Sequence, residues 1–143
     1  MEDTQHRVWQ RVLSQPDQEQ EDLRGLLNGA RELAAVYQRL LLRQTGQRRE
    51  LLQQLYETAR RNVFCLRGMC RLSGQNWGKQ KPLPLGQEQE KRLLQICYHR
   101  SRRAMTEYTA RSAQTEYGPV YQKMARREED QCDRLSQLLG QWE

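Results

Sequence analysis

The sequence predicts an all-α protein: a four-helix bundle with a long connection between its second and third helices and a short helix at the N-terminus. Three observations predict this fold class. The strong helix formers Leu, Ala, Arg, Gln and Glu are abundant, and the chain of 143 residues contains a single Phe. Apolar side chains recur every three or four residues along four long stretches. Glycine or proline separates these stretches, as is typical of helix ends.

The N-terminal segment, residues 1–16, is expected to form a short helix and a linker before the bundle, which takes residues 17–143 as one domain. A helix is predicted over about residues 4–14 because its apolar side chains lie at helical spacing: Val8, Trp9, Val12 and Leu13. Pro16 ends this helix, since proline cannot continue one.

The first half of the bundle is predicted to be a pair of antiparallel helices, over about residues 17–44 and about 47–73, with Gly46 between them. The inward face of the first helix carries Leu23, Leu27, Ala30, Ala34, Tyr37 and Leu41. The inward face of the second carries Leu51, Leu55, Ala59, Asn62, Leu66 and Met69.

The connection from Ser73 to Gly86 contains three glycines and two prolines, so an extended chain is expected there. Its length is informative. Extended residues at ~3.3 Å each would reach about 40 Å, and a helix of about 26 residues is about 39 Å long. The connection can therefore run the whole length of the bundle, which predicts that the second and third helices are parallel.

The second half of the bundle is predicted to be a hairpin of helices over about residues 87–112 and about 119–140, with a turn at Gly118 and Pro119. The inward face of the third helix carries Leu94, Cys97, Ser101, Ala104 and Tyr108. The inward face of the fourth carries Tyr121, Met124, Glu128, Gln131, Leu135 and Leu138.

The composition argues against a membrane protein, because charged residues make up 29% of the chain and its mean hydropathy is −1.03. No apolar run approaches the roughly 18 residues that a membrane span needs. The first residues lack the basic and then apolar pattern of a signal peptide, so a cytoplasmic location is expected. The four cysteines lack zinc-like spacing and are expected to be small buried residues: Cys65, Cys70, Cys97 and Cys132.

One layer of the predicted bundle bears on chemistry. The inward positions nearest the midpoints of the long helices are Ala30, Ala59, Asn62, Ser101, Glu128 and Gln131. Side chains at one height of a bundle can meet at its centre, and this layer offers one carboxylate and no imidazole. A pair of iron ions needs several anionic oxygen donors and some nitrogen donors. The residues therefore predict that no di-metal site forms.

Three passages carry a resemblance to a known family: Ala30–Leu40, Ala59–Asn62 with the following Leu66–Gly68, and the stretch from Glu107–Tyr108 through Glu116–Val120 to Glu128–Gln131. Over about residues 20–140 the chain resembles the rubrerythrin-related, ferritin-like proteins of bacteria. The resemblance implies a ferritin-like four-helix bundle. It also implies that the chain descends from proteins whose bundle holds two iron ions.

Carried over residue by residue, the family's ligand positions fall on the six residues of the midpoint layer, and only Glu128 matches. Where the family has Glu, two variable residues and His, this chain has Ala59 and Asn62. Glu32 could instead supply the ligand of the first helix. Tyr37 and Tyr108 resemble tyrosines that lie near iron in the family, although a Tyr on an apolar face is commonly a core residue. The resemblance thus implies the fold without ferroxidase, peroxidase or iron-storage activity.

Glu128 has three interpretations: a surviving ligand of one metal ion, a carboxylate facing an aqueous gap, or a buried carboxylate with polar partners. A buried charge needs such partners, because an unpaired one costs several kcal/mol or takes up a proton. The candidate partners are Asn62, Gln131, Ser101 and the hydroxyl groups of Tyr37 and Tyr108.

We therefore expect a non-catalytic scaffold or interaction protein that has lost its di-iron site, has no cofactor, and forms a homodimer or binds a protein partner. Two alternatives stay open. In one, Glu128 and Glu32 hold a single ion of iron or another divalent metal. In the other, a net charge of +6 indicates a protein that associates with nucleic acid. The arginines nevertheless interleave with acidic residues, as on a solvated face: Arg48, Arg49, Arg60, Arg61, Arg100, Arg102, Arg103, Arg126 and Arg127.

Overall fold

The computed structural model describes residues 23–74, 89–113 and 116–141. Within these residues the backbone forms helices and no strand, which confirms the all-α class. The first helix covers residues 23–41, and it is followed by α2 (Gly46–Leu72), α3 (Glu90–Ser112) and α4 (Gly118–Gln141). The predicted N-terminal helix and linker, residues 1–16, lie outside the described residues, as does most of the predicted connection.

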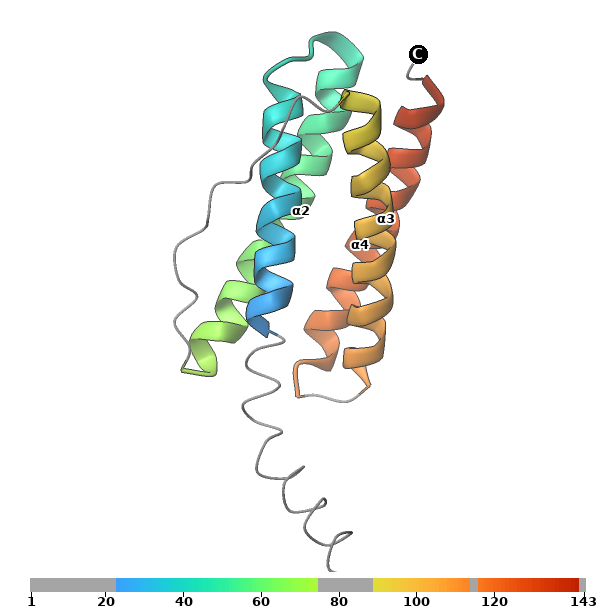
Figure 1. The fold of residues 1–143 in the computed structure, drawn as a ribbon. Coiled ribbons are helices and arrows are strands. Elements are labelled where there is room, and N and C mark those ends of the chain that lie inside the picture. Colours follow the sequence, from blue (N-terminus) through green and yellow to red (C-terminus); the bar gives the residue numbers. More distant parts are fainter. Residues whose placement is uncertain (1–22, 75–88, 114–115, 142–143) are drawn as a thin grey trace, which may run out of the picture.

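Two hydrogen bonds at one end of the bundle establish the directions of the helices. Gln44 Nε2, just after the first helix, donates to Glu90 Oε2 at the start of α3 over 2.7 Å. Arg48 Nη2, near the start of α2, donates to the carbonyl oxygen of Gln141 at the end of α4 over 3.1 Å. The helices α2 and α3 therefore start at the same end and run in parallel, while the first helix and α4 run in the opposite direction (Figure 1).

The helices occupy the corners of a bundle. Helix α4 packs against both α3 and α2, whereas the described residues of α2 and α3 make no close backbone contact with each other. An ion pair between Glu32 and Arg100 joins the first helix to α3. The parallel pair α2 and α3 is consequently placed on one diagonal of the bundle, with α4 beside both of them.

Two helix ends lie about three residues from their predicted positions. The first helix ends at residue 41, because the chain reverses direction through residues 42–45 before α2 begins at Gly46, whose φ of 67° is left-handed. Helix α3 starts at Glu90 because Gln89 has an extended backbone, with φ −61° and ψ 142°. The carboxylate of Glu90 is then in the first turn, where it interacts favourably with the helix dipole.

The turn between α3 and α4 requires a glycine. A Cβ atom on Gly118 would lie 2.5 Å from the carbonyl oxygen of Ser112, closer than any side chain tolerates. Pro119 follows in the first turn of α4. A backbone N–H in this turn has no carbonyl acceptor within the helix, so proline, which lacks the N–H, loses no hydrogen bond there. This close approach lets α3 and α4 pack as a tight hairpin.

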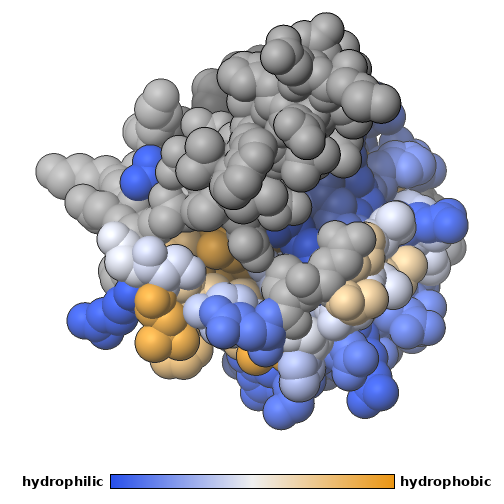
Figure 2. Space-filling model, turned by 90° about the horizontal axis from the view of Figure 1, so that it is seen from below, coloured by the Kyte–Doolittle hydropathy of each residue, from blue (hydrophilic) through white to orange (hydrophobic). Residues whose placement is uncertain are grey.

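The surface of the described residues is largely hydrophilic. Viewed from the end where α2 and α3 finish, blue residues predominate and orange ones gather in small areas (Figure 2). Among the residues that the structure describes, the large apolar side chains that are exposed are Leu42, Phe64 and Leu72. No helix in the described part of the chain has both the length and the apolar composition needed to cross a membrane.

Candidate functional site

A layer of polar side chains lies in the middle of the bundle, between two apolar clusters. The cluster near the start of α2 includes Leu52 and Leu55, and the cluster near its end includes Leu66 and Met69. On α2, α3 and α4, buried polar residues lie between these clusters. We call them the polar layer, and they are Asn62, Ser101, Glu128 and Gln131. All are buried, and the most exposed, Glu128, is only 3% accessible.

The six residues of the predicted midpoint layer are all buried, including Ala30 and Ala59. These two alanines belong to the apolar clusters on either side of the polar layer. The tyrosines predicted to neighbour the layer, Tyr37 and Tyr108, are buried in the same way.

Hydrogen bonds in the polar layer join α2 to α4. Asn62 Nδ2 donates to Glu128 Oε1 over 2.9 Å. The other end of the same amide, Oδ1, accepts a hydrogen bond from Arg127 Nη1 at 3.3 Å. Because a guanidinium can only donate, this contact fixes which end of the Asn62 amide faces the carboxyl group. A continuous chain of donors and acceptors therefore runs from half-buried Arg127 through Asn62 to Glu128.

Gln131 provides a second link between the same helices. Its Nε2 donates to the backbone carbonyl of Leu55 over 2.9 Å. Within the described residues, four buried oxygen atoms of the region have no hydrogen-bond partner of regular geometry: Tyr37 Oη, Ser101 Oγ, Glu128 Oε2 and Gln131 Oε1. Buried polar atoms are normally paired. Whether these oxygens have a donor depends on whether the Glu128 carboxyl carries a proton.

Burial raises the pKa of the Glu128 carboxyl, and the adjacent Ser101 hydroxyl and Asn62 amide oppose that rise because they stabilise the ionised form. The Ser101 hydroxyl is thus beside the carboxyl group without completing a regular hydrogen bond. A protonated Glu128 would supply a donor on Oε2 for such a neighbouring oxygen. Burial is also the main cause of the raised phenol pKa values of Tyr37 and Tyr108, to which Glu128 contributes. Both hydroxyl groups remain protonated at neutral pH.

The polar layer does not fit the pair of iron ions that the family resemblance implies. Such a site takes four carboxylates and two imidazoles from the four helices. Ala30 and Ala59 have no side-chain donor atom, and Asn62 directs an N–H group at Glu128 Oε1, one of the two oxygens of the layer's single carboxylate. Among the residues that the structure describes, no group of three or more His, Cys, Asp or Glu side chains is arranged to hold a metal ion.

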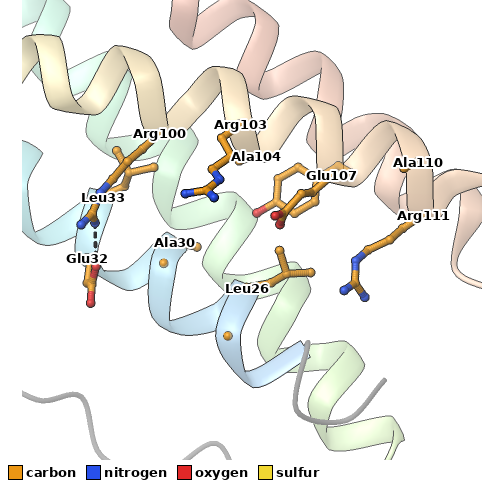
Figure 3. Close-up of a pocket in the computed structure, with 13 residues that line it drawn as sticks. Leu26, Ala30, Glu32, Leu33, Arg100, Arg103, Ala104, Glu107, Ala110 and Arg111 are labelled. Carbon is orange, nitrogen blue, oxygen red and sulfur yellow. Dashed lines mark hydrogen bonds and ion pairs between the residues drawn. The ribbon is translucent and has the colours of Figure 1, made fainter. Parts of the chain in front are cut away.

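Glu32, the alternative ligand of the first helix, faces a different part of the molecule. Its Oε2 accepts a hydrogen bond from Arg100 Nη1 at 2.6 Å, and both side chains are partly exposed. The pair lies in a groove of about 670 Å³ between the first helix and α3, which Arg103 and Glu107 also line (Figure 3). Glu32 is therefore committed to a surface ion pair.

The four cysteines are free thiols, of which Cys65 is half-buried and Cys70, Cys97 and Cys132 are buried. Burial raises the pKa of Cys97 to about 12 and that of Cys132 to about 11. These two side chains therefore stay protonated at neutral pH, where a thiol is a poor nucleophile and metal ligand.

A second concave site, which the sequence reasoning missed, lies on the outer surface of α2 and α4. This α2–α4 pocket, of about 420 Å³, is lined by Glu57, Arg60, Arg61, Val63, Phe64, Cys65, Arg67 and Arg127. The alternation of arginines with acidic residues predicts a solvated face, whereas the structure places Arg60 and Arg61 in this pocket. The spacing of Arg60, Phe64 and Arg67 at intervals of four and three residues could have indicated that they share one side of the helix.

In the polar layer and in the α2–α4 pocket, polar groups of α2 and α4 converge. One is closed and hydrogen-bonded, and the other is open and basic. Comparison of the chain with protein-family models, with curated proteins and with solved structures finds no match.

Proposed function

We propose that this protein is a non-catalytic scaffold or interaction protein, built on a ferritin-like bundle in which hydrogen bonds have replaced a di-iron site. The observation that carries the proposal is the hydrogen bond from Asn62 Nδ2 to Glu128 Oε1. The parallel direction of α2 and α3 supports the ferritin-like assignment, because a long crossover between parallel helices is a feature of that fold.

The orientation of the Asn62 amide is the reason that a metal ion is disfavoured. The hydrogen atoms on Nδ2 carry partial positive charge and lie where a cation would bind the carboxylate. Turning the amide round would place its oxygen near Glu128 but would break the contact with Arg127. A metal ion bound through Oε1 would therefore have to displace both interactions, and one bound through Oε2 would gain a single carboxylate oxygen beside a neutral amide and a hydroxyl.

The polar layer has a structural role under this proposal. The contacts of Asn62 with Glu128 and of Gln131 with the Leu55 carbonyl both cross from α2 to α4. Sliding either helix along the other would leave these buried groups unpaired, at a cost of about 1–3 kcal/mol each. The layer thus specifies one register of the bundle, as single buried polar residues do in coiled coils. The partner of the scaffold is a second copy of the chain or another protein.

The proposal is tested by comparing the wild type with a variant that restores the missing ligands. The substitutions are Ala30→Glu, Ala59→Glu, Asn62→His, Ser101→Glu and Gln131→His. Without metal the clustered carboxylates repel one another, so the variant should melt at a lower temperature, and Fe²⁺ or Mn²⁺ should raise its melting temperature.

The same metals should leave the melting temperature of the wild type unchanged. A rise in the wild-type value that is lost in Glu128→Gln would show that the native layer binds metal, and it would overturn the proposal. A variant that folds but does not respond to metal would contradict the assignment of these positions to one layer.

A further inference from the structure

The α2–α4 pocket has an unbalanced charge. Four arginines and one glutamate line it: Arg60, Arg61, Arg67, Arg127 and Glu57. Within the described residues none of the four guanidinium groups forms an ion pair. Glu57 instead accepts a hydrogen bond from Gln53. Like charges held together in a concave surface raise the local potential and attract an anion.

One of these arginines is held in place by the protein. Arg127 projects from α4 towards α2, where Nη1 contacts Asn62 Oδ1 at 3.3 Å and Cys65 Sγ at 3.4 Å. These contacts use one nitrogen of the guanidinium, so its remaining N–H groups stay available to a ligand. A guanidinium that is already positioned loses less conformational freedom when it binds an oxyanion.

An exposed aromatic ring accompanies this charge. The side chain of Phe64 is 78% accessible although it is large and apolar, and it is the only Phe in the chain. It shares the pocket with Arg60 and Arg67, which lie one helical turn before and after it on α2. Packing in the core does not explain why an aromatic side chain is found at this exposed position.

We propose that the α2–α4 pocket binds a nucleotide unit, with the phosphate held by Arg61 and Arg127 and the base stacked on Phe64. Guanidinium groups match the oxygens of a phosphate in charge and geometry, and aromatic side chains stack on bases in proteins that bind single strands. The sources of such a unit are a free nucleotide and a single-stranded nucleic acid. The proposal does not rest on the scaffold function, although Asn62 of the polar layer helps to position Arg127.

The combination of residues distinguishes this ligand from an acidic peptide. Carboxylates would satisfy the arginines equally well, but they offer no planar group to cover Phe64. A nucleotide carries its anion and its flat apolar face on one rigid frame, and the pocket presents complementary groups side by side. Its volume of about 420 Å³ is within the range of small-molecule sites.

The test measures binding of a fluorescent single-stranded oligonucleotide by anisotropy at several salt concentrations. Arg61→Gln and Phe64→Ser should each weaken binding roughly tenfold. Arg61→Gln should also reduce the slope of log affinity against log salt by about 0.7, the value for one lost phosphate contact. Arg92→Gln is the matched control, since it removes the same charge from an exposed position on α3 outside the pocket, and it should change affinity less than twofold.

Arg127→Gln should have the same effect as Arg61→Gln, but it also removes a partner of Asn62 and could lower stability. Circular dichroism therefore accompanies each variant. Arg61→Gln, which changes an exposed side chain, keeps the test valid if Arg127→Gln fails to fold.

The rate of alkylation of Cys65 reports whether the pocket is occupied. Cys65 lines the pocket and is half-buried, whereas the other three cysteines are buried. A bound oligonucleotide should slow alkylation of Cys65 at least fivefold. Protection by adenosine monophosphate alone would identify a free nucleotide as the ligand, and protection by the oligonucleotide alone would identify the polymer.

Three results would overturn the proposal. The first is the absence of measurable binding by both probes. The second is an equal loss of affinity in Arg92→Gln and Arg61→Gln, which would indicate diffuse attraction to the whole basic surface. The third is binding of a ligand without bases as tightly as the normal oligonucleotide. An abasic oligonucleotide and poly-glutamate are both such ligands, because neither offers a base to Phe64.

Discussion

At the scale of single residues, the environment of Glu128 decides what the centre of the bundle does. The same carboxyl group beside imidazoles and other carboxylates would be a metal ligand. Here it is surrounded by an amide, a hydroxyl and apolar side chains, and burial raises its pKa. Its chemistry is therefore that of a hydrogen-bonding core residue, which leads to a prediction about pH.

Replacing Glu128 with Gln should stabilise the protein at neutral pH. Because the folded-state pKa is raised above the usual value of 4.5, the stability that depends on this carboxyl is fully present below about pH 4.5 and is lost as the pH rises through the folded-state pKa. Glutamine keeps the acceptor for Asn62 and does not ionise. The variant should melt higher than the wild type at about pH 7.5, by roughly 2–5 °C for each kcal/mol gained.

The difference in melting temperature should shrink at about pH 4, where both side chains are neutral. Thermal denaturation of both proteins across this pH range measures it. A difference that is the same at every pH would show that ionisation of Glu128 plays no part.

A second residue-scale prediction concerns the thiols. Cys65 is half-buried, while Cys70, Cys97 and Cys132 are buried, and burial raises the pKa of each buried thiol. At about pH 8 an alkylating reagent should therefore modify one cysteine quickly and three only when the protein unfolds. Mass spectrometry of timed samples, with Cys65→Ser as the control, identifies the fast site. Rapid modification of Cys97 in the folded protein would contradict the described core.

At the scale of helices, the pattern of apolar residues was enough to predict where the elements lie, because an amphipathic helix repeats its inward face every three or four residues. The length of the connection after Ser73 was enough to predict that α2 and α3 are parallel. The ends of the first helix and of α3 were misplaced, since they depend on the backbone angles of Gly46 and Gln89.

A matched pair of glycine substitutions tests the α3–α4 turn. Gly118→Ala should destabilise the protein by more than about 1 kcal/mol, because the new Cβ would lie 2.5 Å from the Ser112 carbonyl oxygen. Gly68→Ala, within α2 and with open space around the new Cβ, should stabilise it by roughly 0.5–1 kcal/mol. Urea denaturation measures both. Equal effects of the two substitutions would be inconsistent with the tight turn.

The N-terminal helix predicted at about residues 4–14 stays a prediction, because it lies outside the described residues. Such a short helix is marginal alone in water, so Trp9 should be buried against the bundle or against a second copy. Trp9→Ala should lower stability by on the order of 3 kcal/mol. A lowered mass in light scattering would indicate docking on a second copy. Unchanged melting and unchanged mass would exclude both arrangements.

At the scale of the whole molecule, the bundle combines a closed polar centre with a basic outer pocket. The sequence was sufficient to select the four residues of the polar layer, since each falls on an inward face near the middle of its helix, but it did not select Arg31, which is also buried. Asn62 was among the candidate partners of Glu128, and their hydrogen bond confirms it. The other partners were not predicted. The orientation of the Asn62 amide depends on Arg127 of another helix, and the ion pair of Glu32 depends on Arg100 of α3. The α2–α4 pocket was missed for the same reason, because Arg127 completes it from α4.

The central claim is that hydrogen bonds between side chains, and not metal ions, occupy the middle of this bundle. Elemental analysis of protein produced with excess iron and then treated with a chelator tests it most directly. With one carboxylate in the layer, and that carboxylate paired with Asn62, the chain should retain well under about one metal ion. Retention of about two iron ions per chain, the content of an intact di-iron bundle, would contradict the account.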